Sequence, residues 1–138
     1  MMKEINKDVK KGSKMYGNIA HNIYAQNNTG IESPVKLIEM LYEGVLRFNA
    51  QAKKAIKDAD IEKKFYWTNR SIAIITELIQ VLDFEVKGDL PAYLSGLYNY
   101  QIQLLSRAAA YNELDKIDEC SNVFRTLLEV WRESNNVA

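Results

Sequence analysis

An apolar repeat of about 3.6 residues, recurring in four long segments, is the feature that most constrains how this chain can fold. The segments cover roughly residues 34–57, 61–84, 90–111 and 114–134. Only two prolines and six glycines interrupt the 138 residues, and no strand-like alternation competes with the helical pattern. The repeat therefore predicts four amphipathic helices, each with one broad apolar side.

Helix boundary signals fall between these segments. Ser33 suits an N-cap, and Pro34 suits the first helical position because its missing N–H would have no partner there. Residues 58–60 and 86–89 are expected to be turns, and Asn112 is expected to cap the last helix in a variant of the capping box. Connections this short place successive helices antiparallel. We predict an all-α, antiparallel up-down four-helix bundle.

The chain before the bundle divides into two parts. Residues 1–14 are expected to form a flexible leader, since their apolar residues follow no sustained pattern. Residues 15–30 carry a short apolar stripe and predict a short extra N-terminal helix, which needs something to pack on. The bundle domain is expected to cover residues 31–138. We hypothesise that the segment up to Gln26 is an autoinhibitory flap over an apolar groove.

Composition narrows the class of protein. The 18 basic residues balance the 18 acidic ones, which argues against a dedicated nucleic-acid binder. A single cysteine favours a reducing compartment. The chain has neither an apolar signal-peptide core nor a stretch long enough to span a membrane. We expect a cytoplasmic protein that does not insert into membranes.

The sequence lacks the combinations of residues that catalysis or metal binding in a helical bundle would require. A two-metal site in a helical bundle requires two inward Glu-x-x-His motifs, whereas the only histidine is His21. Cys120 lies on an apolar stripe and is interpreted as a buried small hydrophobe without a histidine partner. Phosphate-binding and nucleophile-elbow motifs are absent. We expect no enzyme activity, no cofactor and no metal.

Aromatic and apolar residues exceed what one inward stripe per helix requires. The chain has eight tyrosines, two tryptophans and four phenylalanines. The surplus is explained either by a wide core with scattered surface aromatics or by an external groove that receives amphipathic helices of a partner. Tyrosine and tryptophan are favoured at such interfaces. The pattern alone leaves both explanations open.

Residues 31–44, which read IESPVKLIEMLYEG, resemble the signature of the bacterial flagellar secretion chaperone family, the FliS-type flagellin chaperones. The segments at residues 22–26, 77–100 and 128–132 are also similar to that family. The resemblance covers about residues 16–133. Lys36, Glu32 and Lys87 depart from the family pattern at peripheral positions.

The resemblance implies a cytosolic export chaperone. Family members bind the C-terminal helices of flagellin, prevent premature polymerisation and aid delivery to the flagellar type III export gate. The resemblance also leaves open whether the protein contacts other flagellar regulators or co-chaperones. We predict that the partner docks on exposed apolar residues of the first three helices, at or near Tyr24, Ile31, Leu37, Tyr42, Leu97 and Tyr98. The alternative is a self-associating helical structural or adaptor protein.

Overall fold

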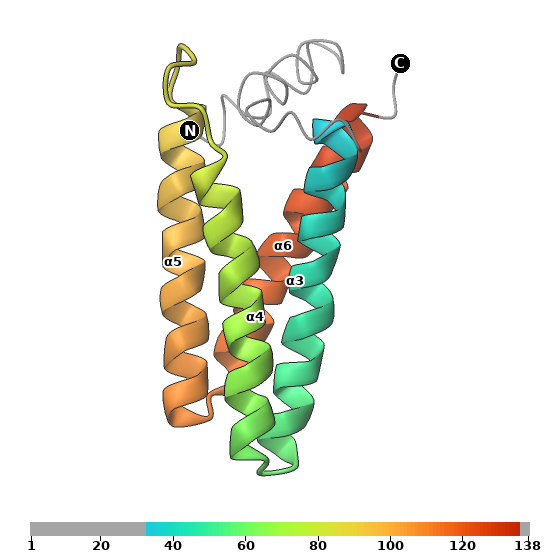
Figure 1. Ribbon diagram of the computed structural model, residues 1–138, viewed down its shortest axis with the longest axis vertical. Coiled ribbons are helices and arrows are strands. Elements are labelled where there is room, and N and C mark those ends of the chain that lie inside the picture. Colours follow the sequence, from blue (N-terminus) through green and yellow to red (C-terminus); the bar gives the residue numbers. More distant parts are fainter. Residues whose placement is uncertain (1–32, 136–138) are drawn as a thin grey trace.

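The computed structural model describes residues 33–135, and this part of the chain consists of four helices without a strand. They are α3 (Pro34–Lys57), α4 (Ile61–Gln80), α5 (Leu90–Tyr111) and α6 (Leu114–Asn135). Figure 1 shows them running alternately up and down, with the two tight turns at one end. The predicted four-helix bundle is confirmed. The proposed leader at 1–14 and the short helix at 15–30 lie outside the described residues.

The helices begin where the sequence places their caps. The Ser33 hydroxyl accepts the N–H of Lys36 at 3.2 Å, and Pro34 occupies the first turn of α3. Asp60 likewise accepts the N–H of Lys63 at 3.0 Å and caps α4. These contacts satisfy backbone donors that have no partner within the helix.

Helix α4 ends at Gln80, four residues before its expected end. The Leu82 N–H bonds the Ile79 carbonyl, which tightens the last turn, and the Asp83 side chain accepts the Glu85 N–H at 2.9 Å. A short acidic side chain offers the backbone an alternative to the helical bond, so the chain turns here. Leu82 itself stays in the core, which explains why the apolar pattern runs past the helix.

Asn112 does not cap the last helix as predicted. It is the C-cap of α5, with left-handed backbone angles (φ 57°, ψ 42°), and its side-chain oxygen accepts Lys64 Nζ at 2.9 Å. Asparagine tolerates this conformation better than most residues, so the α5–α6 connection can be very short.

The core contains one polar layer among aliphatic and aromatic side chains. Asn49 of α3 donates to the Ser121 hydroxyl of α6 at 3.1 Å, and the Ser71 hydroxyl of α4 donates back to the Asn49 oxygen at 2.7 Å. All three side chains are buried. This layer ties three helices together at one level, because a buried polar group is stable only when it is paired.

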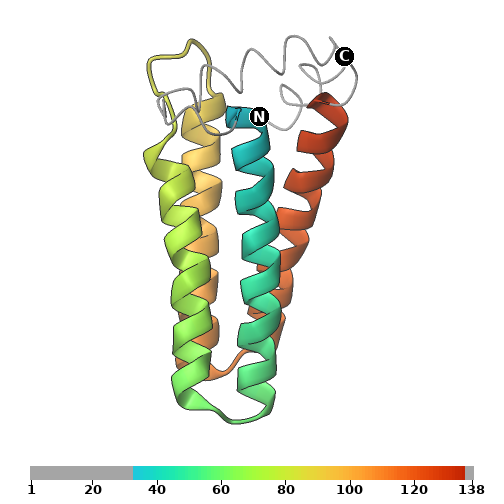
Figure 2. The same ribbon diagram turned by 45° about the vertical axis from the view of Figure 1, so that its right-hand side comes forward.

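The helices surround the core in the cyclic order α3, α4, α5, α6. Figure 2 shows α3 in front, flanked by α4 on one side and α6 on the other. At Gly44, α3 and α4 approach so closely that a Cβ atom would lie 2.7 Å from Ile74 Cδ1. The α3–α4 side and the α5–α6 side are therefore opposite faces of the bundle.

Candidate partner-binding surfaces

Tyr42 and Tyr98, two of the predicted binding residues, lie in the core. Their exposed fractions are 2% and 0%, and their hydroxyl oxygens are 2.8 Å apart. The Phe124 ring packs against both, edge-on to Tyr42 and stacked on Tyr98. The expected surface position of these tyrosines is therefore wrong. The apolar pattern does not distinguish a buried tyrosine from a buried leucine. Both tyrosines can be buried here because their hydroxyl groups form a hydrogen bond with each other.

Leu37 belongs to a row of apolar side chains along α3 and α4. Leu37 and Leu41 are one turn apart on α3, on the side that reaches α4 at Gly44. Ile74 of α4 and Val81, the C-cap residue that follows α4, are seven residues apart, and all four side chains are half-buried. We name these four residues the α3–α4 row. It presents partly covered apolar surface at the end of the bundle where α3 begins.

Leu97 belongs to a second row on the opposite face. Tyr93, Leu97 and Tyr100 follow one another at helical spacing on α5, and the Tyr100 hydroxyl donates to a Glu119 carboxylate oxygen of α6 at 3.4 Å. Leu127 and Val130 follow Glu119 on the same side of α6. These five apolar and aromatic residues form the α5–α6 row, in which Tyr100 is 49% exposed and the other four are half-buried.

The structure does not bring the predicted binding residues together at one point. Leu37 and Leu97 lie on opposite faces of the bundle, and Tyr24 and Ile31 lie outside the described residues. A partner that touches both Leu37 and Leu97 must therefore pass around the bundle rather than sit in a single groove.

The side between α3 and α6 is closed by polar contacts. Arg132 donates through Nε to Glu39 and through Nη2 to Glu43, and Trp131 Nε1 donates to the Val35 carbonyl at 2.9 Å. The hydrogen bond from Arg132 holds the pKa of Glu39 below its ordinary value, with help from Lys36. This side of the bundle offers a fixed ionic clamp instead of an apolar row.

Cys120 is buried on α6, as the sequence indicates. Burial raises the pKa of its thiol to about 12, so the thiolate that a nucleophile needs is not formed near neutral pH. Across residues 33–135 no group of three His, Cys, Asp or Glu side chains could hold a metal ion. The helices in this range are also too short or too polar to cross a membrane.

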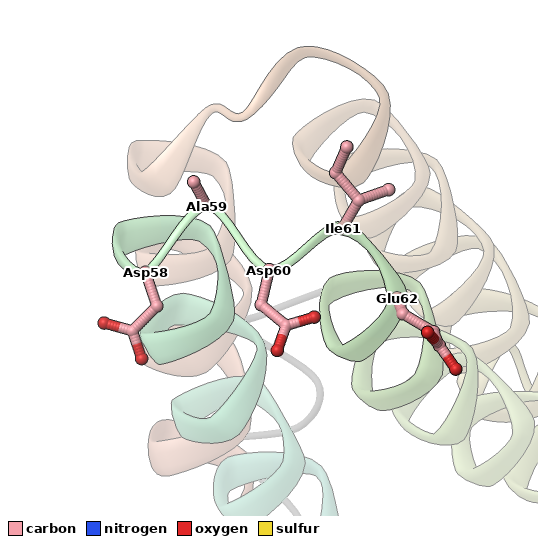
Figure 3. A pocket seen from close by; sticks show the side chains of 5 residues that line it. All are labelled: Asp58, Ala59, Asp60, Ile61 and Glu62. Atoms are coloured by element: carbon pink, nitrogen blue, oxygen red, sulfur yellow. The ribbon is translucent and has the colours of Figure 1, made fainter.

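A shallow pocket lies at the α3–α4 turn, lined by residues 58–62 (Figure 3). The Asp58 carboxylate bonds Lys54 Nζ at 2.8 Å, and Asp60 caps α4. In Figure 3 the Ala59 and Ile61 side chains point to the opposite side from these two carboxylates. The Asp58 and Asp60 carboxylates therefore stabilise the end of α3 and the start of α4, and we assign no ligand to the pocket.

A comparison with protein families decides what kind of bundle this is. The family model described as "Flagellar protein FliS" matches residues 16–138. The chain belongs to the FliS family. It is a flagellar chaperone, and the resemblance found in residues 31–44 is confirmed.

Similar proteins in this family come from several bacteria. The flagellar secretion chaperone FliS of Campylobacter jejuni is 56% identical over 122 residues, covering 88% of this chain and 95% of that protein. The Escherichia coli K12 protein of the same name is 31% identical over 127 residues, covering 87% and 92%. A solved bacterial flagellar chaperone shares the fold, with a TM-score of 0.71 at 20% identity over 82% of this chain and 92% of that chain.

Sequence reasoning missed a cluster of arginine and aromatic side chains on α3 and α4. Phe48 and Trp67 fit the general apolar pattern of their segments, and Arg47 and Arg70 belong to no sequence motif. Their closeness depends on how α3 and α4 are rotated against each other, and no motif records that rotation.

Proposed function

We propose that this protein binds the C-terminal helices of flagellin in the cytoplasm, keeps them from polymerising prematurely and aids their delivery to the flagellar type III export apparatus. Membership of the FliS family supports a flagellar client, and the names of the relatives support a role in secretion. Filament-forming helices expose apolar surface before assembly, and a carrier must cover that surface reversibly.

The observation that carries the proposal is the pair of apolar rows on opposite faces of the bundle. The α3–α4 row contains Leu37 and the α5–α6 row contains Leu97, and side chains in both rows are only half-buried. An amphipathic client helix can lay its apolar side on each row. Because the rows face away from each other, the client is proposed to contact them with two separate helices joined by a connector.

Binding alone is proposed to be sufficient for this role, without a catalytic step. A client held on half-buried apolar rows is released by competition or by a change of conformation, since no covalent bond links it to the chaperone. The buried and protonated thiol of Cys120 supports this proposal, because it removes the strongest nucleophile of the described residues from reaction.

Titration calorimetry of the full chain with a synthetic flagellin C-terminal peptide tests the proposal. We expect one-to-one binding with a negative heat-capacity change, the mark of apolar burial. The matched control is the same peptide with its apolar positions replaced by serine. Equal heats for the two peptides, or none for the flagellin peptide, would contradict the proposal.

Self-association is the competing explanation for the apolar rows. It predicts a dimer that persists on dilution and ignores the flagellin peptide. Size-exclusion chromatography with light scattering separates the two, because a chaperone with free rows is expected to form a one-to-one complex when the peptide is added.

A further inference from the structure

Two arginines and three aromatic rings form a compact cluster on the outer side of α3 and α4. The Phe48 and Trp67 ring centroids are 5.4 Å apart, and Tyr66 meets Trp67 edge-on at 4.8 Å. The Arg70 guanidinium lies 4.9 Å from the Phe48 centroid and 5.6 Å from that of Tyr66, and Arg47 lies 5.5 Å from Phe48. We name these five residues the arginine–aromatic patch.

The cationic charge of the patch is not neutralised within the described part of the chain. Neither Arg47 nor Arg70 forms an ion pair there, and Arg70 Nη1 donates to the Tyr66 hydroxyl at 3.5 Å. Arg107 and Arg132, by contrast, both bind carboxylates. The rings hold the two guanidinium groups close to the surface, so less side-chain entropy is lost when they bind a carboxylate.

We propose that the arginine–aromatic patch is a docking site for an acidic amphipathic segment of a second protein. Carboxylates of that segment would pair with Arg47 and Arg70, since a guanidinium accommodates a carboxylate in a two-bond geometry. An aromatic or leucine side chain beside them would pack on Tyr66, which is 52% exposed, and on the half-buried Trp67. Charge complementarity therefore defines the partner.

A protein segment fits the patch better than a nucleic acid. Affinity for a nucleic acid comes from many phosphate contacts along a basic track, whereas the patch contains two arginines in a chain with zero formal net charge. Two carboxylates next to one apolar side chain match the patch in size and charge.

The patch lies farther along the same side of α3 and α4 than the row residues assigned to flagellin. Phe48 lies two turns beyond Leu41 on α3, toward the α3–α4 turn, and no member of the patch belongs to either row. Substitution of Arg47 and Arg70 therefore leaves the row residues unchanged, and the two proposals are tested with different peptides.

Fluorescence anisotropy with a labelled synthetic peptide tests this inference. The probe carries one tryptophan and one leucine a helical turn apart, flanked by four glutamates, and the control peptide has lysines in place of the glutamates. We expect the full chain to bind the glutamate peptide, with affinity falling as salt rises, and to bind the lysine peptide at least about tenfold more weakly.

Variants place the binding on the patch. R47Q/R70Q should weaken binding about tenfold, and R47K/R70K should recover part of the loss because it restores the charge without the planar fork. R107Q/R125Q is the matched control, since it removes the same charge elsewhere, and it should leave affinity unchanged. Circular dichroism checks that each variant remains helical.

The possible results distinguish an acidic protein segment from a nucleic acid and from a second copy of this chain. Equal affinity for the two peptides, or equal losses in R47Q/R70Q and R107Q/R125Q, would overturn the inference. Tighter patch-dependent binding of single-stranded oligonucleotide than of the glutamate peptide would also overturn it. Dimer formation that R47Q/R70Q abolishes, without peptide binding, would replace the second protein by a second copy. The flagellin peptide should bind R47Q/R70Q as it binds the unchanged chain.

Discussion

The hydroxyl oxygens of Tyr42 and Tyr98 lie 2.8 Å apart in the core and join α3 to α5 across the diagonal of the bundle. Each helix packs side by side with two of the others, whereas α3 and α5 lie diagonally opposite each other. This hydrogen bond therefore fixes a distance that the neighbouring contacts alone leave adjustable.

Replacing either tyrosine by phenylalanine is expected to destabilise the bundle, because a buried hydrogen bond is lost. The free energy of unfolding should fall by about 1 kcal/mol in Y42F and in Y98F. The double variant should lose less than the sum, since both substitutions remove the same bond. Urea unfolding of the four proteins measures the coupling, and strict additivity would show that the hydroxyl pair contributes nothing.

The polar layer around Asn49 should be more sensitive than the tyrosine pair. Asn49→Ala removes the partner of both the Ser71 and the Ser121 hydroxyl, which are buried. We expect a loss of about 2 kcal/mol or more in the free energy of unfolding. Asn69→Ala, at an exposed position of α4, is the control for losing an asparagine from a helix. Equal losses in the two variants would contradict the role assigned to the layer.

The clamp between α3 and α6 is expected to depend on acid pH. The hydrogen bond from Arg132 holds the pKa of Glu39 below its ordinary value of 4.5. A lowered pKa contributes stability that is present above pH 4.5 and is lost as pH falls through the lowered value. Arg132→Gln should therefore reduce the urea midpoint at neutral pH and converge with the unchanged protein in acid. Arg125→Gln, which removes an arginine bonded to Asn122 instead, should not show this convergence.

The two apolar rows can be tested separately. Leu37→Gln and Leu97→Gln should each weaken binding of the flagellin peptide by about tenfold. The reason is that the apolar surface of the leucine is no longer buried against the client. Leu46→Gln and Ile102→Gln are the controls, since these residues are half-buried on other sides of α3 and α5. Calorimetry gives the affinities, and equal effects in rows and controls would argue against the assigned surfaces.

The N-terminal segment provides a fifth prediction, carried by its apolar stripe in the sequence. If residues 1–26 cover an apolar row, their deletion should strengthen binding of the flagellin peptide and increase the fluorescence of a dye that binds exposed apolar surface. The control is deletion of residues 1–14 alone, which leaves the stripe intact. Unchanged affinity and dye fluorescence in the longer deletion would contradict the flap.

Local chemistry allowed the sequence by itself to determine the helices of this protein. A cap such as Ser33, a first-turn proline and an apolar period act within a few residues, so α3 and α5 begin and end where the pattern predicts. The string at residues 31–44 also determined the family. The end of α4 and the cap at Asn112 were misjudged because Leu82 is buried beyond the helix and Asn112 is bonded by Lys64 from another element.

Only the tertiary structure decided which side chains are available to a partner. Tyr42 and Leu37 occupy the same helix and both fit its apolar stripe, yet one is buried and the other lies half-exposed at the side. The difference depends on how each helix is rotated toward its neighbours, which contacts between residues distant in the chain determine. The same rotation places Arg47 of α3 and Arg70 of α4 over one ring, an arrangement that no local pattern encodes.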